Sequence, residues 1–319
     1  MKKFLFYPLC ALLLFIAFAL IYNPAVYMKA CLEGLTVWAV TVAPSLLPFF
    51  FLTLLFTNTQ IAQKFALKLQ KPMALLYNAP PISAFVQLMS FISGYPMGAK
   101  LIAELYKENH ITSEEATKIS IFTSTSGPMF VVGSVGVGML GNKRAGMILL
   151  VSHLLSAILN GIFFRKMPAK NKNAKLSILC TPTQNILYDC AFGATLSCLI
   201  VGAFIAVFYV FCKILEDFSI LKPFVFLFGL LFKDTKKALA FCAGLIECTN
   251  GCILFAKTSG ILTLPLIAFI ISFGGASIIF QSVAFLKEAN VKIKTFLLGK
   301  LIQALTAFAI CFILSLVFV

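Results

Sequence analysis

The sequence SGYPMGAK at residues 93–100 lies inside a long apolar segment, and STSGP at residues 124–128 lies inside the next one. Proline removes a backbone donor and glycine loosens a helix, so a helix that faces lipid has no use for them at this density. Broken backbone at membrane depth is tolerated only where protein or a water-filled cavity satisfies its polar groups. Two such breaks in one membrane protein predict a transport site where they meet.

The composition is that of an integral membrane protein. Of the 319 residues, 61% are hydrophobic and 12% are charged, and the mean hydropathy is +0.99, whereas a soluble domain has about 25% charged residues. The net charge is +15, from 26 Lys and Arg against 11 Asp and Glu. These charges stand in short loops between apolar runs, which is typical of cytoplasmic loops and not of a nucleic-acid-binding face. We expect a multi-pass protein of a bacterial cytoplasmic membrane, with the lipid bilayer as a partner and no nucleic acid.

The chain carries no pattern of an enzyme or a metal site. None of its ten cysteines forms a C-x-x-C pair, and Cys248 and Cys252 have only Glu247 near them in sequence. Cysteines scattered in apolar segments usually behave as small hydrophobes. His110 and His153 are far apart, and no nucleophile elbow, phosphate loop or carboxylate pair is present. We therefore predict no catalytic residue, no metal and no cofactor.

The apolar runs predict an all-α, polytopic transmembrane protein. The first run has an apolar core of about 18 residues, which exceeds the usual 7–15 of a signal peptide and favours a retained transmembrane helix over residues 1–23. The run 223–232 is too short to cross and is expected in the interface or as a half-helix. Residues 112–115 (TSEE) predict a capping box. The runs long enough, or nearly so, to span are 4–22, 34–57, 82–103, 118–140, 145–164, 188–215, 238–256, 261–286 and 295–319.

The charge distribution divides the chain into two halves. Residues 166–176 form, with Arg165, the most basic loop and contain no acid, so this loop is expected in the cytoplasm together with the N-terminus. The runs 34–57 and 188–215 must then enter the membrane from opposite sides. This predicts two inverted repeats, 24–165 and 177–319, each with broken or re-entrant helices. Sequence matches at a nearly constant spacing support them: Ser124, Gly127 and Gly98 match Ser272, Gly275 and Gly251.

The topology requires one re-entrant piece in each half. Either 82–103 and 238–256 dip into the membrane and return, or 118–140 and 261–286 do. The sequence leaves these two alternatives open.

Four polar interruptions of the apolar runs form the candidate site, two in each half. We number them first (94–100), second (124–128), third (247–251) and fourth (272–277). Glu247 is the only acid within an apolar segment away from its ends, and an intramembrane carboxylate is costly enough to predict a function, here ion coupling. The predicted substrate-binding residues are Gly94, Tyr95, Pro96, Gly98, Ser126, Gly127, Pro128, Thr249, Asn250, Gly251, Gly274 and Gly275.

Interrupted helices suggest how such a site works. A half-helix start exposes unpaired N–H groups with positive dipole character, which attract carboxylates or phosphates. Unwound carbonyls can hold a cation. The competing interpretation is that the glycines only let helices pack closely. Lys100 lies near the end of its segment and is expected to pair with Glu104 one turn later.

At these residues the chain resembles the YlbJ-like (SpoVV) sporulation integral membrane proteins, which belong with the nucleoside-recognition or Gate-domain proteins. The family commonly has asparagine before its S-G-P motif, where this chain has Thr125. The resemblance covers most of the chain beyond residue 23. The motifs that carry it are SGYPMGAK (93–100), SGPMF (126–130), VGVG (135–138), ECTNG (247–251), SFGG (272–275) and PSLLPF (44–49).

The resemblance implies a transporter-like fold with inverted repeats, loosely related to concentrative nucleoside carriers. Members of the group in spore formers are associated with moving dipicolinic acid, a small aromatic dianion. We therefore predict a carrier of a small polar solute, anionic and dipicolinate-like or nucleoside-like. The alternatives are a non-transporting membrane scaffold or assembly factor and, more distantly, a membrane enzyme. The sequence leaves a homo-oligomer open.

Overall fold

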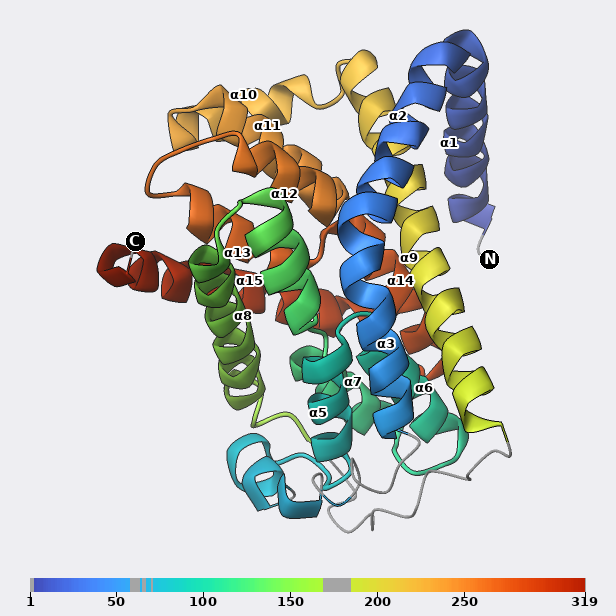
Figure 1. Cartoon of the computed structure of the whole chain (residues 1–319). Helices are drawn as coiled ribbons and strands as arrows, with labels where there is room; N and C mark the ends of the chain where they lie inside the picture. Colours follow the sequence, from blue (N-terminus) through green and yellow to red (C-terminus); the bar gives the residue numbers. More distant parts are fainter. Residues whose placement is uncertain (1–2, 58–63, 65–66, 70, 169–184, 319) are drawn as a thin grey trace.

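The computed structural model describes residues 3–57, 64, 67–69, 71–168 and 185–318, and the described part of the chain is helical, without strands (Figure 1). This confirms the all-α, polytopic fold. The helical stretches long and apolar enough to cross a membrane are Pro24–Phe56, Lys143–Phe163, Ile186–Asp217, Thr263–Glu288 and Ile293–Phe318.

The helices follow the predicted apolar runs closely. In the first half they are α1 (Lys3–Tyr22), α2 (Pro24–Val37), α3 (Ala43–Thr57), α5 (Ser83–Ser93), α6 (Met97–Lys107), α7 (Ser113–Phe122) and α8 (Lys143–Phe163), with π-helical segments η1 (Trp38–Val42), η2 (Met73–Tyr77) and η3 (Met129–Met139). In the second half they are α9 (Ile186–Asp217), α10 (Lys222–Phe232), α11 (Thr235–Ile246), α12 (Cys248–Ala256), α13 (Thr263–Phe273), α14 (Gly275–Glu288) and α15 (Ile293–Phe318).

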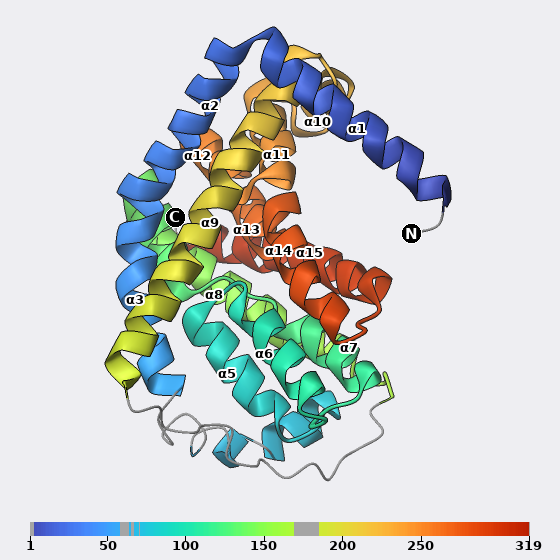
Figure 2. The ribbon, with the colours of Figure 1, turned by 90° about the vertical axis from the view of Figure 1, so that its right-hand side faces the viewer.

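A long helix pair forms one side of the molecule. The continuous stretch α2–η1–α3 packs along α9, and the two lie side by side in Figures 1 and 2. Trp38 fixes their register, because its indole Nε1 donates a hydrogen bond of 3.0 Å to the carbonyl of Cys198. The ring lies over Gly202, where a Cβ would come within 2.6 Å of Trp38 Cδ2. Glycine is therefore required at 202 for this approach.

Each predicted interruption is a break between helices. The first lies between α5 and α6, and the second between α7 and η3. Glu247 separates α11 from α12, and Gly274 separates α13 from α14. The same order of elements therefore occurs in both halves: two short helices, a broken helix and a long helix, α8 or α15. The opposite orientation of the halves stays a prediction.

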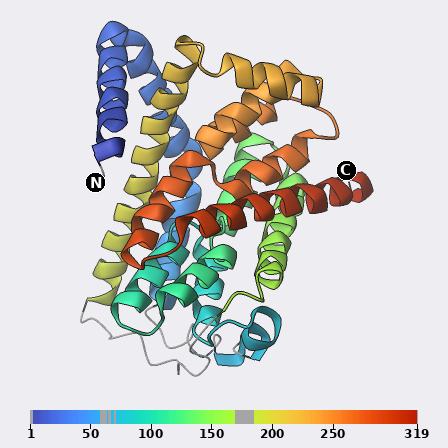
Figure 3. The ribbon, with the colours of Figure 1, turned by 180° about the vertical axis from the view of Figure 1, so that it is seen from behind.

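The shorter pairs are the better candidates for re-entrant segments. α11 and α12 pack along each other, and α5 and α6 are in contact. The longest of these four helices has 12 residues, or about 18 Å at 1.5 Å per residue, and a bilayer core is about 30 Å thick. α13 and α14 together form a 26-residue span, and α15 crosses the molecule and contacts α13 and α8 (Figure 3). Length therefore favours 238–256 as the segment that returns in the second half. In the first half α7 and η3, with 10 and 11 residues, are no longer than α5 and α6, so length does not choose between 82–103 and 118–140.

Local capping explains where two of these helices begin. The predicted capping box is confirmed: Thr112 Oγ1 accepts from the Glu115 N–H (3.3 Å), and Glu115 Oε2 accepts from the Thr112 N–H (2.9 Å). Asp234 caps α11 by accepting from the backbone of Lys236 (2.9 Å). A hydrogen bond from the Lys237 side chain holds the pKa of the Asp234 carboxyl below its usual range.

The topology is directly testable. Residues 169–184, with most of the basic loop, lie outside the described residues, so the expectation rests on the Lys/Arg distribution. Reporter fusions after residues 170 and 290 are expected to be cytoplasmic, and a fusion after Val319 is expected outside. Alkaline phosphatase and green fluorescent protein fusions at each site measure this. A cytoplasmic C-terminus would exclude the inverted arrangement.

Candidate functional site

All four interruptions contribute to one small cavity between the long helix pair and the broken helices. Its polar wall comes from both halves of the chain, and its apolar wall comes chiefly from η1, α3 and α9. The polar lining residues are Ser93, Tyr95, Ser126, Gly127, Glu247, Thr249, Ser277 and Gln281. The apolar lining residues are Val42, Leu46, Phe130, Val201, Ile205 and Ile278.

The central cavity is contracted in this conformation. Its volume is about 50 Å³, enough for a few waters, since each needs roughly 10–15 Å³ on this measure. Pockets for small organic ligands measure about 300–1,000 Å³. A solute of that size can occupy the cavity only after the walls move apart.

Tyr95, in the first interruption, is held by a buried cation. Lys300 on α15 is 1% exposed, and its ammonium donates to the Tyr95 hydroxyl, to the carbonyl of Ser124 (2.9 Å) and to Gln303 Oε1 (3.5 Å). The ammonium also lies 4.7 Å from the centre of the Tyr95 ring. Lys300 therefore links the first and second interruptions. No ion pair joins Lys300 to Glu247 within the described parts of the chain.

His153 on α8 joins the second and fourth interruptions. Its Nε2 accepts a hydrogen bond from the backbone N–H of Ser126 (2.8 Å), and its Nδ1 is 2.7 Å from Ser272 Oγ. An acceptor Nε2 in a neutral imidazole requires the proton on Nδ1, so His153 donates to Ser272. The ring is fully buried.

Glu247, in the third interruption, has both a structural contact and a place in the cavity. Its carboxylate caps α12 by accepting from the backbone N–H of Asn250 at 2.6 Å. The side chain is 1% exposed and lines the central cavity beside Thr249.

At two of the helix starts, backbone N–H groups are already bound by side chains. The Asn250 N–H at the start of α12 is taken by Glu247, and the Ser126 N–H before η3 is taken by His153. Pro128, directly before η3, has no N–H to offer. Side-chain hydroxyls, not these backbone donors, therefore face the cavity.

Several predicted glycines let backbones approach, as the packing interpretation holds. Gly94 has φ +82°, and a Cβ there would overlap the backbone nitrogen of Gly127. A Cβ on Gly98 would overlap the Thr123 carbonyl, and one on Gly251 would overlap Gly244 Cα.

The remaining predicted residues either set the backbone at a helix break or lie away from the central cavity. Gly275 has φ +64°, and a Cβ there would lie 2.7 Å from the Gly244 carbonyl. Gly274 ends α13 with φ +92°, and Pro96 directly precedes α6. Asn250 does not line the central cavity but a separate chamber. The role of all these residues in solute binding stays a prediction.

Two hydroxyl-bearing residues of the polar wall are buried without a hydrogen-bond partner in the described structure. Ser93 Oγ and Ser126 Oγ line the cavity, are each 2% exposed and have no hydrogen-bond partner in the described structure. Nearby, Ser124 Oγ and Gln303 Nε2 are also unpartnered. Buried polar groups are normally satisfied, so a concentration of exceptions points to water or a ligand.

Sequence reasoning missed Lys300 and His153. Lys300 is a cation inside the apolar run 295–319, so the rule that identified Glu247 applies equally to it. His153 has no motif around it, and only the fold brings it to Ser126 and Ser272. The predicted pair of Lys100 and Glu104 is present at 3.9 Å, on the exposed side of α6.

Comparisons with known proteins place the chain in a family. The sporulation integral membrane protein YlbJ of Bacillus subtilis (strain 168) is 30% identical over 321 aligned positions, which cover 92% of this chain and 79% of that protein. No family model matches, and no solved structure matches. Together with the apolar helices, this similarity identifies a multi-pass bacterial membrane protein that belongs to the family of the sporulation integral membrane protein YlbJ.

Proposed function

We propose that the protein is a carrier, not an enzyme, which moves a small polar solute across the membrane through the central cavity. The observation that carries the proposal is the convergence of four helix breaks, from both halves, on one buried polar wall. Paired breaks of this kind form the binding sites of many secondary transporters. The contracted cavity corresponds to an occluded conformation that opens during transport.

The hydrogen-bond inventory supports an anionic or hydroxyl-rich solute. An ammonium only donates, so the Tyr95 oxygen is the acceptor from Lys300 and the phenol hydrogen is available to another group. The hydroxyls of Ser93 and Ser126 are further donors. An apolar wall opposite fits a flat or aromatic body. A pyridine dicarboxylate such as dipicolinate, or a nucleoside, has this combination.

A non-transporting membrane scaffold would explain fewer of these observations than a carrier. The close contacts of Gly98 and Gly251 are what helix packing requires. Packing alone gives no reason for unpartnered hydroxyls at Ser93 and Ser126, because burying them without a partner costs free energy.

Glu247→Gln tests the proposed coupling role of this carboxylate. The amide oxygen can still accept from the Asn250 N–H and keep the cap, but the side chain can no longer exchange a proton. We expect uptake of dipicolinate or uridine to fall about tenfold, equivalent to ~1.4 kcal/mol in the barrier, with the protein folded and inserted. Uptake into vesicles at two pH values, normalised to protein amount, measures this.

Glu104→Gln is the matched control, because this acid lies on α6 and its side chain is 51% exposed. It should leave uptake unchanged. Full activity of Glu247→Gln with an unchanged pH dependence would show that Glu247 only caps α12.

A further inference from the structure

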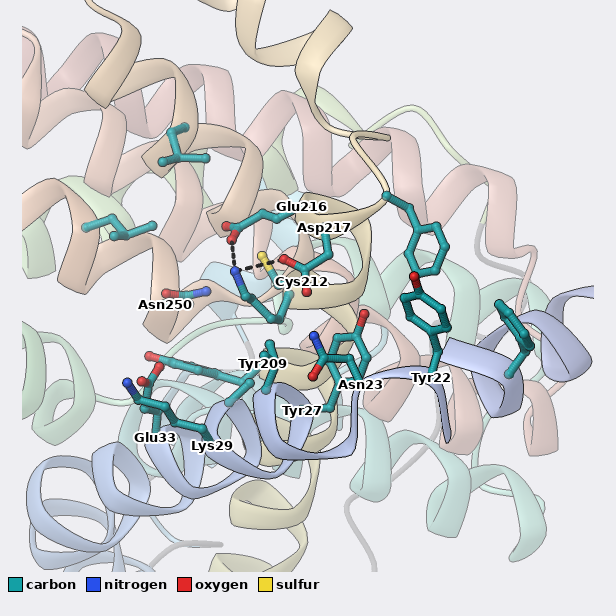
Figure 4. A pocket seen from close by; sticks show the side chains of 17 residues that line it. Tyr22, Asn23, Tyr27, Lys29, Glu33, Tyr209, Cys212, Glu216, Asp217 and Asn250 are labelled. Atoms are coloured by element: carbon teal, nitrogen blue, oxygen red, sulfur yellow. Dashed lines mark ion pairs between the residues drawn. The ribbon is translucent and has the colours of Figure 1, made fainter. Parts of the chain in front are cut away.

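A second, much larger chamber lies beside the central cavity. Its volume is about 1130 Å³, and it is formed by the end of α1, the start of α2, the end of α9 and parts of α11 and α12 (Figure 4). The lining includes Lys29 and Glu33 on one side, and Lys213 with its partners Glu216 (3.7 Å) and Asp217 (3.0 Å) on another. Such a charged lining is unlike the lipid-facing surface of these helices.

The chamber and the central cavity are separated by α9 and α12. On α12, Thr249 lines the cavity and the next residue, Asn250, lines the chamber. On α9, Ile205 lines the cavity, and Tyr209, one turn later, lines the chamber. On both helices, residues within one turn of each other therefore line different spaces. The Asn250 N–H binds the carboxylate of Glu247, which faces the other space.

Tyr209 is the polar group of this wall. Its side chain is 8% exposed, and its hydroxyl has no hydrogen-bond partner in the described structure. Gly34 on α2 leaves room for this side chain, because a Cβ there would lie 3.1 Å from Tyr209 Cβ. A buried hydroxyl at the junction of two polar spaces, without a protein partner, is placed to bind a passing polar molecule.

We propose that the chamber is the access route of the polar solute to the central cavity, with Tyr209 and Asn250 at its narrowest point. The inference rests on the proposed carrier function. The charge distribution that places the basic loop before α9 in the cytoplasm puts the end of α9, and with it the chamber, at the outer face. The competing occupant is a lipid tail, since α1 leans away from the rest of the molecule (Figure 2).

Thiol labelling distinguishes water from lipid in the chamber. Lys29→Cys places a thiol in its wall, and Met28→Cys places one on the neighbouring position of α2, which is 72% exposed and does not line the chamber. A hydrophilic, membrane-impermeant methanethiosulfonate applied from outside is expected to modify the first variant and not the second. Cys212 also lines the chamber, so both variants are made in a Cys212→Ser background, and peptide mass spectrometry locates the label. Absence of modification at 29 would indicate a lipid-filled groove and overturn the inference.

Transport of defined probes tests the route itself. With dipicolinate and uridine as probes, modification of Lys29→Cys is expected to block uptake. Tyr209→Phe should slow it about fivefold, the effect of one lost hydrogen bond, while labelling at 29 persists. Tyr188→Phe, at the other end of α9 and 70% exposed, is the control and should transport normally.

The possible failures are distinguishable. Labelling without any loss of uptake, or normal uptake by Tyr209→Phe, would overturn the route while the carrier function stands. No uptake of either probe by the unmodified protein would instead overturn the proposed function and the route with it.

Discussion

Replacement of Gly94 by alanine is expected to prevent stable folding. Gly94 has φ +82°, and a Cβ there would overlap Gly127 N, lie 2.8 Å from Gly127 Cα and lie 3.0 Å from Ser126 C. The neighbours are backbone atoms, which cannot rotate away as a side-chain end can. With ψ at −163°, Gly94 is in a region that essentially only glycine adopts, and the backbone strain of roughly 1–3 kcal/mol adds to overpacking of about 1–3 kcal/mol. We expect a loss of about 3 kcal/mol or more, seen as a lower thermal midpoint in detergent and less protein in the membrane.

Gly141→Ala separates the two contributions. Gly141 also has positive φ, +61°, but a Cβ there meets nothing within 4 Å. This variant should show only the backbone strain, about 1–2 kcal/mol. Equal stability of the two variants would mean that the contact between the first and second interruptions does not hold them together.

Removal of the charge at Lys300 is expected to lower uptake strongly with little change in stability. Lys300→Met removes the hydrogen bonds to Tyr95, Ser124 and Gln303, worth roughly 1.5–3 kcal/mol each when a charge is involved. It also removes the cost of burying an ammonium, several kcal/mol. The two nearly offset, and no ion-pair partner is left stranded in the described structure. Tyr95 loses its fixed position, so uptake should fall by tenfold or more, which is ~1.4 kcal/mol.

Lys118→Met is the matched control. Lys118 is also 1% exposed and donates to carbonyls of Asn78 (2.9 Å), Arg165 (3.0 Å) and Met167 (2.7 Å), away from the cavity. By the same balance its loss should change the thermal midpoint little, and uptake per folded molecule should persist. If both lysine variants lose uptake only in proportion to folded protein, Lys300 is a structural residue and not part of the site.

The positions of the helix breaks were predictable from sequence because they depend on local chemistry. Proline, glycine and hydroxyl residues inside apolar runs disturb a helix wherever they occur, so the breaks at Gly94, Gly274 and around Ser126 follow from the residues themselves. The capping box at Thr112 is local in the same sense. The family similarity was equally readable, since it rests on contiguous motifs.

The partners of those breaks were not predictable, because they come from distant helices. His153 meets Ser126 and Ser272 only through the packing of α8 against η3 and α13. The division of Thr249 and Asn250 between two spaces depends on how α12 is rotated. Sequence gives the residue types but not this rotation.

The polar and apolar walls of the central cavity come largely from different parts of the chain, which for a carrier would separate the choice of cargo from the energetics of transport. Val201 and Ile205 touch the body of whatever occupies the cavity, yet neither takes part in the hydrogen-bond network of Lys300 and His153. Exchanging one aliphatic side chain there would reshape the space without disturbing any buried charge. A lineage built on this plan can acquire a new cargo by a few conservative steps and keep its buried polar machinery unaltered.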